Sequence, residues 1–366
     1  MMKSCCANCI GDREITRGVI PTYSLDIAYM LTNKIGYIRL NKFSATTFQE
    51  FDDALKKLKT QGMTKLVLDL RDNGGGYLQA AIDIADEFLS EGKLIVYTKG
   101  IHKPKSVEYA TNKGNFEKGQ LVILVNEFTA SASEIVSGAI QDNDRGIIIG
   151  RKSFGKGLVQ EQVKLSDGSA IRLTIARYYT PTGRCIQRPY SEGTEEYYNQ
   201  FYEQLIAAES ENPDSIKFAD SLKFKTPKGK IVYGGGGIMP DVYITVDKDE
   251  KSKYFNLLFN KGFIFQFAFD YVDKNRQNLK RLYKSSQEFI NGFTVNDAIL
   301  NDLISYSTKN GLKKDENGIK LSGDKIKIYL KANIGRNIFR DDAYYPVIQK
   351  VDNTLIKAIS VIDTLK

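Results

Sequence analysis

Short apolar runs alternate with helix-forming segments in the first half of this chain, and this alternation narrows the possible fold classes. Runs at 65–70, 121–125 and 146–150 end in turn residues and have the length of strands buried on both faces. Apolar residues with helical spacing follow the first run at 78–89 and the second at about 131–141. Buried strands that alternate with helices are typical of an α/β core with a mostly parallel sheet.

Weaker signals on either side of these runs complete the expected secondary structure. Thr47 and Glu50 have the spacing of a capping box, and apolar residues continue behind them with helical spacing as far as Leu58. The sequence Leu-Ser-Asp-Gly predicts the turn of a β-hairpin. The other expected elements are strands at 24–31, 34–40, 158–164 and 169–176, and helices at 197–208, 295–306 and 344–362.

The histidine and cysteine content limits the chemistry that this chain can carry out. The only histidine, His102, lies in a polar, turn-like stretch, so we expect a surface residue and not a catalytic base. One histidine cannot supply a zinc site with several imidazoles. Of the four cysteines, Cys5, Cys6 and Cys9 crowd the N-terminus and no second Cys/His cluster follows, whereas Cys185 is isolated. The sequence therefore predicts incidental thiols, no metal site and no cofactor.

Charge and hydropathy argue against two further classes of partner. Lys and Arg number 52 and Asp and Glu number 44, which gives a net charge of +8, but the basic residues are scattered. No nucleic-acid partner is therefore predicted. No apolar run approaches the ~18 residues of a membrane span. Residues 1–20 lack the apolar core of a signal peptide, so we expect no export signal in this sequence.

Two short motifs imitate known catalytic signatures and fail on their context. Residues 150–157 nearly match a phosphate-binding P-loop, but Gly157 stands where a hydroxyl must hold Mg²⁺, and a strand-like segment follows. Ser153 and Lys156 have the Ser-x-x-Lys spacing of β-lactamases, which requires a helix that Gly155 and Gly157 disfavour. Neither nucleotide binding nor β-lactamase chemistry is predicted.

Ser131, Lys156 and a glycine-rich turn remain as candidate reactive groups. Ser131 stands between a buried strand and a helix, where it is either a simple helix cap or an exposed nucleophile. The triglycine at 74–76 is either a tight turn or an anion-binding turn of free backbone N–H groups. A desolvated lysine can replace histidine as the base that activates a serine. Serine with lysine is therefore the remaining route to a serine nucleophile.

With these residues the sequence resembles the C-terminal processing peptidases, the tail-specific family of Ser/Lys proteases. The resemblance covers roughly residues 20–245. The helical part beyond it is similar to the tail of Bacteroidetes-type members. The matching motifs occur in family order, at 66–76, 125–134, 150–160, 179–184 and 237–241.

The resemblance implies a role for each of five residues. Ser131 would be the nucleophile, Lys156 the general base, and Gln160 the residue that aligns the lysine. The backbone N–H groups of Gly76 and Ala132 would form the oxyanion hole. Two neighbours of these residues stay open as alternatives. Ser133 competes for the role of nucleophile, and Asp142, on a family acidic position, is interpreted as structural.

The family's fold implies an α/β core of the ClpP/crotonase type, with buried strands and helices and a helical C-terminal appendage. Acyl transfer by a serine endopeptidase is the implied reaction, on unfolded or C-terminally apolar polypeptides that bind as an added strand. The alternative, from another functional class, is a catalytically inactive or partner-dependent peptide-binding module. An intact set of Ser131, Lys156 and Gln160 favours the enzyme.

The resemblance also implies a division into three parts. Residues 1–20 would be the remnant of a preceding PDZ domain, with a last strand at 14–20, residues 21–248 the peptidase core, and residues 249–366 a helical domain. The helical domain is the candidate surface for a homo-oligomer or an adaptor. The family implies the bacterial cell envelope or periplasm as the location.

Overall fold

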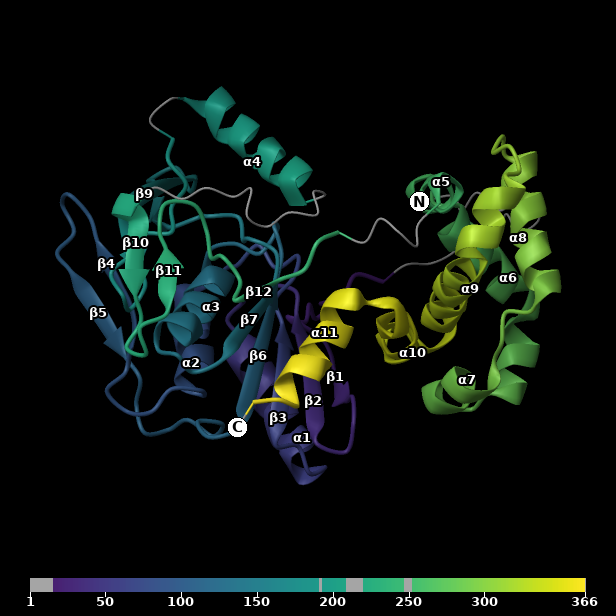
Figure 1. Ribbon diagram of the computed structural model, residues 1–366, viewed down its shortest axis with the longest axis horizontal. Coiled ribbons are helices and arrows are strands. Elements are labelled where there is room, and N and C mark those ends of the chain that lie inside the picture. Colours follow the sequence, from purple (N-terminus) through teal and green to yellow (C-terminus); the bar gives the residue numbers. More distant parts are fainter. Residues whose placement is uncertain (1–15, 191–192, 209–219, 247–251, 366) are drawn as a thin grey trace.

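The computed structural model describes residues 16–190, 193–208, 220–246 and 252–365. A six-stranded sheet with the order β1-β2-β3-β6-β7-β12 forms the centre of the chain (Figure 1). Only β1 pairs antiparallel with its neighbour, and the other pairs are parallel. The strands are β1 (Leu25–Met30), β2 (Ile35–Leu40), β3 (Lys65–Asp69), β6 (Gln120–Val125), β7 (Ile147–Gly150) and β12 (Val242–Tyr243).

Helices cover both faces of this sheet, which explains the continuous apolar runs of β3, β6 and β7. One face packs against α1 (Thr47–Thr60), α2 (Leu78–Asp86) and α3 (Ala132–Asp142) in the largest of three core clusters of the described residues. The other face packs against α11 (Asn353–Ile362), which crosses the sheet in Figure 1. Buried apolar side chains from the strands and from α11 form one cluster there: Val67, Val122, Leu124, Ile149, Leu355, Ala358 and Ile362.

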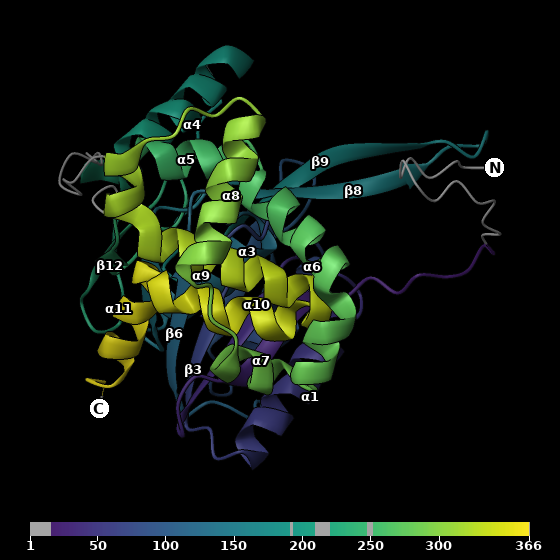
Figure 2. The ribbon, with the colours of Figure 1, turned by 90° about the vertical axis from the view of Figure 1, so that its right-hand side faces the viewer.

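A second, antiparallel sheet with the order β5-β4-β9-β8 flanks the first. Its strands are β4 (Leu94–Lys99), β5 (Ser106–Tyr109), β8 (Leu158–Lys164) and β9 (Ala170–Tyr179). The hairpin of β8 and β9 projects far from the body of the molecule (Figure 2). The small elements nearby are α4 (Thr194–Ala208), η2 (Asp220–Leu222), β10 (Lys223–Lys225) and β11 (Ile231–Tyr233).

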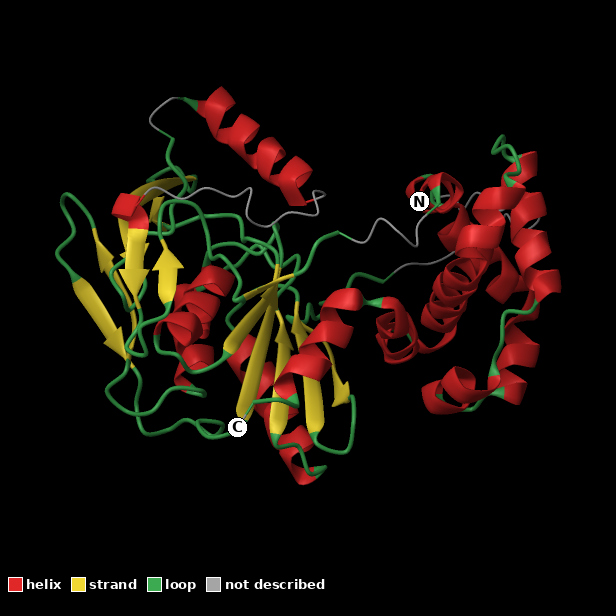
Figure 3. Ribbon diagram, in the orientation of Figure 1, coloured by secondary structure: helices red, strands yellow, loops and turns green. Residues whose placement is uncertain are grey.

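The C-terminal third is helical and has a core of its own, as the red ribbons of Figure 3 show. Phe289, Leu303 and Ile326 are buried in that core. Its helices are α5 (Lys253–Asn260), α6 (Phe263–Leu282), α7 (Ser286–Gly292), α8 (Asp297–Lys309), α9 (Glu316–Phe339) and α10 (Asp341–Ile348). A short 3-10 turn, η3 (Gln349–Val351), then leads back to the central sheet and α11.

The fold class is confirmed as a mixed α/β core with a helical C-terminal region. Three local predictions are wrong. The helical spacing over 344–362 predicts one helix, but the chain breaks at η3 because Asp352 adopts an extended conformation and caps α11 through its contact with Leu355 N–H. Thr47 is the first helical residue of α1, and Thr46 occupies the cap position. The Glu50 carboxylate, which a capping box would direct to the Thr47 N–H, instead accepts the N–H groups of Ser24 and Leu25.

The third wrong prediction is the strand at 14–20. Its described part, residues 16–20, forms no strand and is exposed. Cys5, Cys6 and Cys9 lie outside the described residues. Among the residues that the structure does describe, no helix has the length and hydropathy that a membrane crossing requires.

Candidate active site

The candidate residues gather where three parallel strands of the central sheet end. The triglycine turn follows β3, Ser131 follows β6, and Lys156 follows β7. The carboxyl ends of neighbouring parallel strands lie at one edge of a sheet, which is where open α/β sheets bind their ligands. A cleft of about 510 Å³ lies at this edge and is lined by all five residues of the predicted site: Gly76, Ser131, Ala132, Lys156 and Gln160.

Ser131 is held in a backbone conformation that few residues other than glycine adopt. Its φ is 57° and its ψ is −116°, at the N-cap position directly before α3. Such a conformation costs on the order of 1–3 kcal/mol and persists only where the surroundings enforce it. Both predicted interpretations of Ser131 require the N-cap position, but a simple cap does not require this strain. The strained turn instead favours a serine displayed toward the cleft.

Glu134 ties the serine turn to the lysine loop. One of its carboxylate oxygens accepts the backbone N–H groups of Ser131 and Lys156, each at 2.8 Å. The other oxygen accepts the Ser153 hydroxyl at 2.5 Å and the Gly155 N–H at 2.7 Å. Burial raises the pKa of Glu134, and these four donors act against that rise. The carboxylate thereby fixes the main chain on both sides of the cleft.

Tyr178 makes a second bridge between the same two segments. Its hydroxyl lies 3.0 Å from the Ser131 carbonyl oxygen and also donates to the Lys156 carbonyl oxygen. Burial raises the pKa of Tyr178 well above its usual value, so the hydroxyl remains a donor. Through Glu134 and Tyr178, both the N–H group and the carbonyl group of Ser131 and of Lys156 are held in place.

Two backbone N–H groups beside Ser131 have no acceptor in the described part of the chain. They belong to Gly76, at the end of the triglycine turn, and to Ala132, the first residue of α3. The turn and the serine approach each other main chain to main chain. A Cβ atom on Gly75 would come within 2.6 Å of the Ala130 oxygen and 2.8 Å of the Ala132 nitrogen. Two free donors at the N-terminus of a helix and on an adjacent turn suit a developing negative charge.

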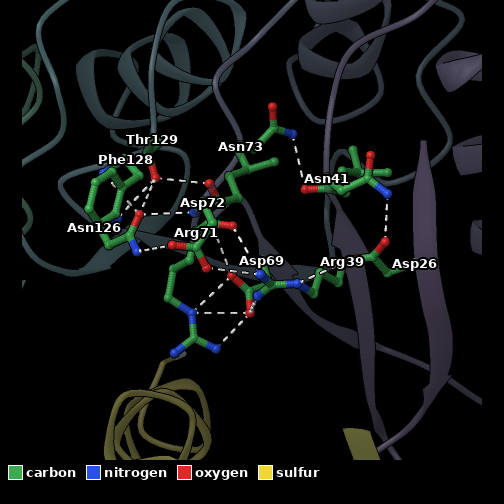
Figure 4. A network of polar contacts seen from close by, with 12 residues as sticks. Asp26, Arg39, Asn41, Asp69, Arg71, Asp72, Asn73, Asn126, Phe128 and Thr129 are labelled. Atoms are coloured by element: carbon green, nitrogen blue, oxygen red, sulfur yellow. Dashed lines mark hydrogen bonds and ion pairs between the residues drawn. The ribbon is translucent and has the colours of Figure 1, made fainter. Parts of the chain in front are cut away.

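Asn73 holds the triglycine turn against the serine segment. Its side-chain oxygen accepts the Gly75 N–H at 2.9 Å, and its side-chain nitrogen donates to the Leu40 carbonyl at 3.0 Å. Its main-chain oxygen accepts both the Ala130 N–H and the Ser133 hydroxyl at 3.0 Å. Beside Asn73, Figure 4 shows a polar network that joins Asp72, Asn126 and Thr129. Thr129 closes this network onto β3 by donating to the Leu70 carbonyl at 2.8 Å.

Comparison with protein families assigns this region. Residues 34–196 match the model described as peptidase family S41. This segment is a peptidase family S41 domain. The family is one of serine peptidases, and the match contains Gly76, Ser131, Lys156 and Gln160. Residues 254–341, in the helical part, match a family of unknown function, DUF8443.

Curated relatives of the S41 domain are C-terminal processing enzymes. A carboxyl-terminal-processing protease of Synechocystis sp. is 49% identical over 148 residues, which are 40% of this chain and 34% of the relative. A carboxy-terminal-processing protease of Bartonella bacilliformis is 41% identical over 181 residues, 48% of this chain and 41% of the relative. The chain thus spans about a third to two fifths of the length of these relatives.

Among solved structures, the photosystem II D1 C-terminal processing protease matches with 31% identity and a TM-score of 0.42. That match covers 58% of this chain and 42% of the solved chain.

The structure also describes the residues that the sequence left as alternatives or set aside. Ser133, the alternative nucleophile, is fully buried, and its hydroxyl donates to the main-chain oxygen of Asn73 and not into the cleft. Asp142 forms a buried ion pair with Arg184 at 2.7 Å, which agrees with a structural role. His102 is exposed on a turn outside the cleft. Ser153 lies in a non-helical segment, which agrees with the rejection of the β-lactamase motif.

Glu134 and Tyr178 are the residues of this site that the sequence analysis leaves unassigned. The spacing Ser131-x-x-Glu134 is a capping-box pattern, and this signal points to Glu134 as the acceptor of the Ser131 N–H. No local pattern marks Tyr178, because its contacts with Ser131 and Lys156 depend on how β9 packs against both loops. No group of three or more His, Cys, Asp or Glu side chains in the described residues is arranged to hold a metal ion.

The burial of Lys152, in the loop before Lys156, leads us to expect that the stability of the protein depends on pH. Burial, and then the charge of Arg188, lower its pKa from 10.5 to about 8. Between these values the unfolded chain holds a proton that the folded chain has lost, so the free energy of unfolding should rise with pH, by up to ~3 kcal/mol. Lys152→Met should remove this rise and be the more stable protein at pH 7.

Urea unfolding of the wild type and Lys152→Met at pH 7, 8, 9 and 10 measures this difference. Equal slopes of stability against pH in the two proteins would contradict the assignment to Lys152.

Proposed function

We propose that this chain is a serine endopeptidase in which Ser131 is the nucleophile and Lys156 the general base. One observation carries the proposal. A strained serine, a lysine and two backbone N–H groups without acceptors line a single cleft in an S41 domain. Because the chain spans only part of its relatives, the activity is inferred from the site itself.

The proposed reaction is acyl transfer. The Ser131 oxygen attacks a peptide carbonyl and forms a C–O bond, while its proton passes to the Lys156 amine. The N–H groups of Gly76 and Ala132 bind the resulting oxyanion. Lys156 then returns the proton to the leaving amine as the C–N bond breaks. Water, deprotonated by the same lysine, hydrolyses the ester. Gln160 on β8 lines the same cleft and would orient Lys156.

The cleft favours an extended, unfolded polypeptide as the substrate. β8 is an edge strand of its sheet among the described residues, so its outer edge is open to a peptide that adds as a further strand. The apolar side chains of Leu78, Ile135 and Leu158 line the cleft and suit an apolar residue of the substrate. A substrate with an apolar C-terminal segment meets both conditions.

The proposal extends to the location of the protein and to its domain organisation. The relatives are processing proteases of bacteria and chloroplasts, and by analogy we propose a bacterial envelope or periplasmic location. We also propose residues 21–248 as the peptidase core and 249–366 as a helical partner domain, from which α11 returns to the core. That domain is the proposed surface for self-association or an adaptor.

Digestion of β-casein, an unfolded protein, tests the function. We expect the purified chain to cleave β-casein into discrete peptides and the Ser131→Ala variant to leave it intact. Ser133→Ala is a neighbouring control and should keep cleavage, since the Ser133 hydroxyl faces Asn73. No cleavage by a folded wild-type chain would reject the endopeptidase and favour the peptide-binding module.

A further inference from the structure

A segment from the C-terminal end of the chain reaches the loop that carries the triglycine turn. This segment, which we call the C-terminal strap, consists of η3, Asp352 and the start of α11, and it lies beside the end of β3. Asp352 forms a two-pronged ion pair with Arg71, with Arg71 Nη1 at 3.0 Å from one carboxylate oxygen and Nη2 at 2.7 Å from the other. In Figure 4 the Arg71 side chain points toward the yellow C-terminal helices.

Both members of this pair are shielded from water. The side chains of Arg71 and Asp352 are 15% and 23% exposed, so their attraction is weakly screened. The partner that Arg71 also contacts, Asp69, is completely buried and accepts hydrogen bonds from Arg39 and Tyr37 as well. Two arginines thus share the carboxylate of Asp69, and Asp352 supplies a further negative charge to balance Arg71.

Arg71 belongs to the short connection between β3 and the predicted oxyanion donor. Its backbone N–H donates to Asp69 at 2.9 Å, which fixes the start of the connection. The next residue, Asp72, has a positive φ of 62°, and its N–H and carboxylate both bind the Asn126 side chain. Asn73 follows and accepts the N–H of Gly75, next to Gly76. Only four residues separate Arg71 from Gly76, so the position of one sets the position of the other.

We propose that Asp352 is a positioning residue, through which the C-terminal strap holds Arg71 and thereby aims the Gly76 N–H into the cleft. This inference rests on the proposed function, since it gives Asp352 a role in the oxyanion hole of the same site. Asp352 lies 221 residues after Ser131 in the sequence and does not line the cleft. The carboxylate therefore acts on the reaction through Arg71 and not by contact with substrate.

Asp352→Asn is the sharpest variant because it changes one interaction. Asparagine keeps the side-chain oxygen that caps α11 at Leu355, and it is as good a helix cap as aspartate. Its amide nitrogen then faces the Arg71 guanidinium, where two donors cannot bond. Asp363→Asn is the matched control. Asp363 pairs with Lys65 at 2.9 Å and so joins the same strand, β3, to the end of α11, away from the cleft.

Steady-state kinetics on an unfolded peptide substrate, below the unfolding temperature of every variant, test the proposal. For Asp352→Asn we expect a roughly tenfold fall in kcat, because a small displacement of an oxyanion donor weakens transition-state binding. KM should stay within about twofold, since the peptide-binding edge of β8 is untouched. Asp363→Asn should retain the wild-type kcat, and Asp352→Glu should recover much of the loss. Unchanged kcat in Asp352→Asn, beside an active wild type and an inactive Ser131→Ala, would overturn this inference alone.

Hydrogen exchange tests the same proposal without reference to catalysis. Peptides that cover residues 70–78 should exchange their amide protons several-fold faster in Asp352→Asn than in the wild type. Asp363→Asn should leave the exchange of this segment unchanged. Equal exchange of the segment in all three proteins would overturn the proposal even if the chain cleaves no peptide.

Discussion

Lys156→Arg should lose at least ~10³-fold in kcat/KM on an unfolded substrate. Arginine keeps the positive charge but stays protonated at any working pH, so it cannot accept the proton from Ser131. Removal of one member of a catalytic set of this kind typically costs ~10⁴-fold or more. The contacts of Lys156 with Glu134 and Tyr178 use only its main chain, and the substitution leaves them in place. Loss of activity would therefore report on the amine and not on the fold of the loop.

The matching control for this substitution is Lys164→Arg, at the exposed far end of β8, the strand that follows Lys156 in the chain. It should keep wild-type activity. Thermal unfolding should give similar midpoints for the wild type and both variants. A Lys156→Arg protein with wild-type kcat/KM would contradict the assignment of Lys156 as the base.

Glu134→Gln should damage both activity and stability. The two oxygens of Glu134 accept four donors, and glutamine replaces one oxygen by a donor group. At least one buried N–H group is then left without an acceptor, which we expect to cost about 2–4 kcal/mol in the free energy of unfolding. We expect kcat to fall by ~10²-fold, because Ser131 and Lys156 lose their common anchor.

Ser153→Ala separates the two effects of Glu134→Gln. It removes one donor to Glu134 and leaves the contacts with Ser131 and Lys156 intact. Urea unfolding should show a loss of stability in both variants, whereas initial rates of peptide cleavage should fall only in Glu134→Gln. A Glu134→Gln protein with the kcat of Ser153→Ala would show that Glu134 does not position the reactive residues.

The sequence indicates which residues line the cleft better than it predicts the fold around them. Residues of the site come from motifs that follow the strands β3, β6 and β7, and each of these strands contains a short, mostly apolar run. Two strands of the second sheet, β4 and β5, give weaker signals, because β5 is short and largely exposed and the second half of β4 is only partly buried. They are therefore absent from the expected elements.

Long-range packing accounts for the other differences. The spacing of Leu355, Ala358 and Ile362 shows that α11 is amphipathic, but it does not reveal which surface the apolar face covers. Only the structure places these residues against the central sheet. The same is true of the pairing of Arg71 with Asp352, 281 residues apart. A sequence pattern within one segment does not indicate a contact with a residue so distant in the chain.

Trapping of the acyl-enzyme would show directly whether Ser131 is the nucleophile. The wild-type chain is mixed with an activated ester of a short apolar peptide, quenched in acid within one turnover, digested and analysed by mass spectrometry. We expect an added mass equal to that of the acyl group on the fragment that contains Ser131. The corresponding fragment of Ser131→Ala should carry no added mass. An active wild type that carries its acyl group on another residue, or a Ser131→Ala protein that still cleaves β-casein, would contradict this assignment.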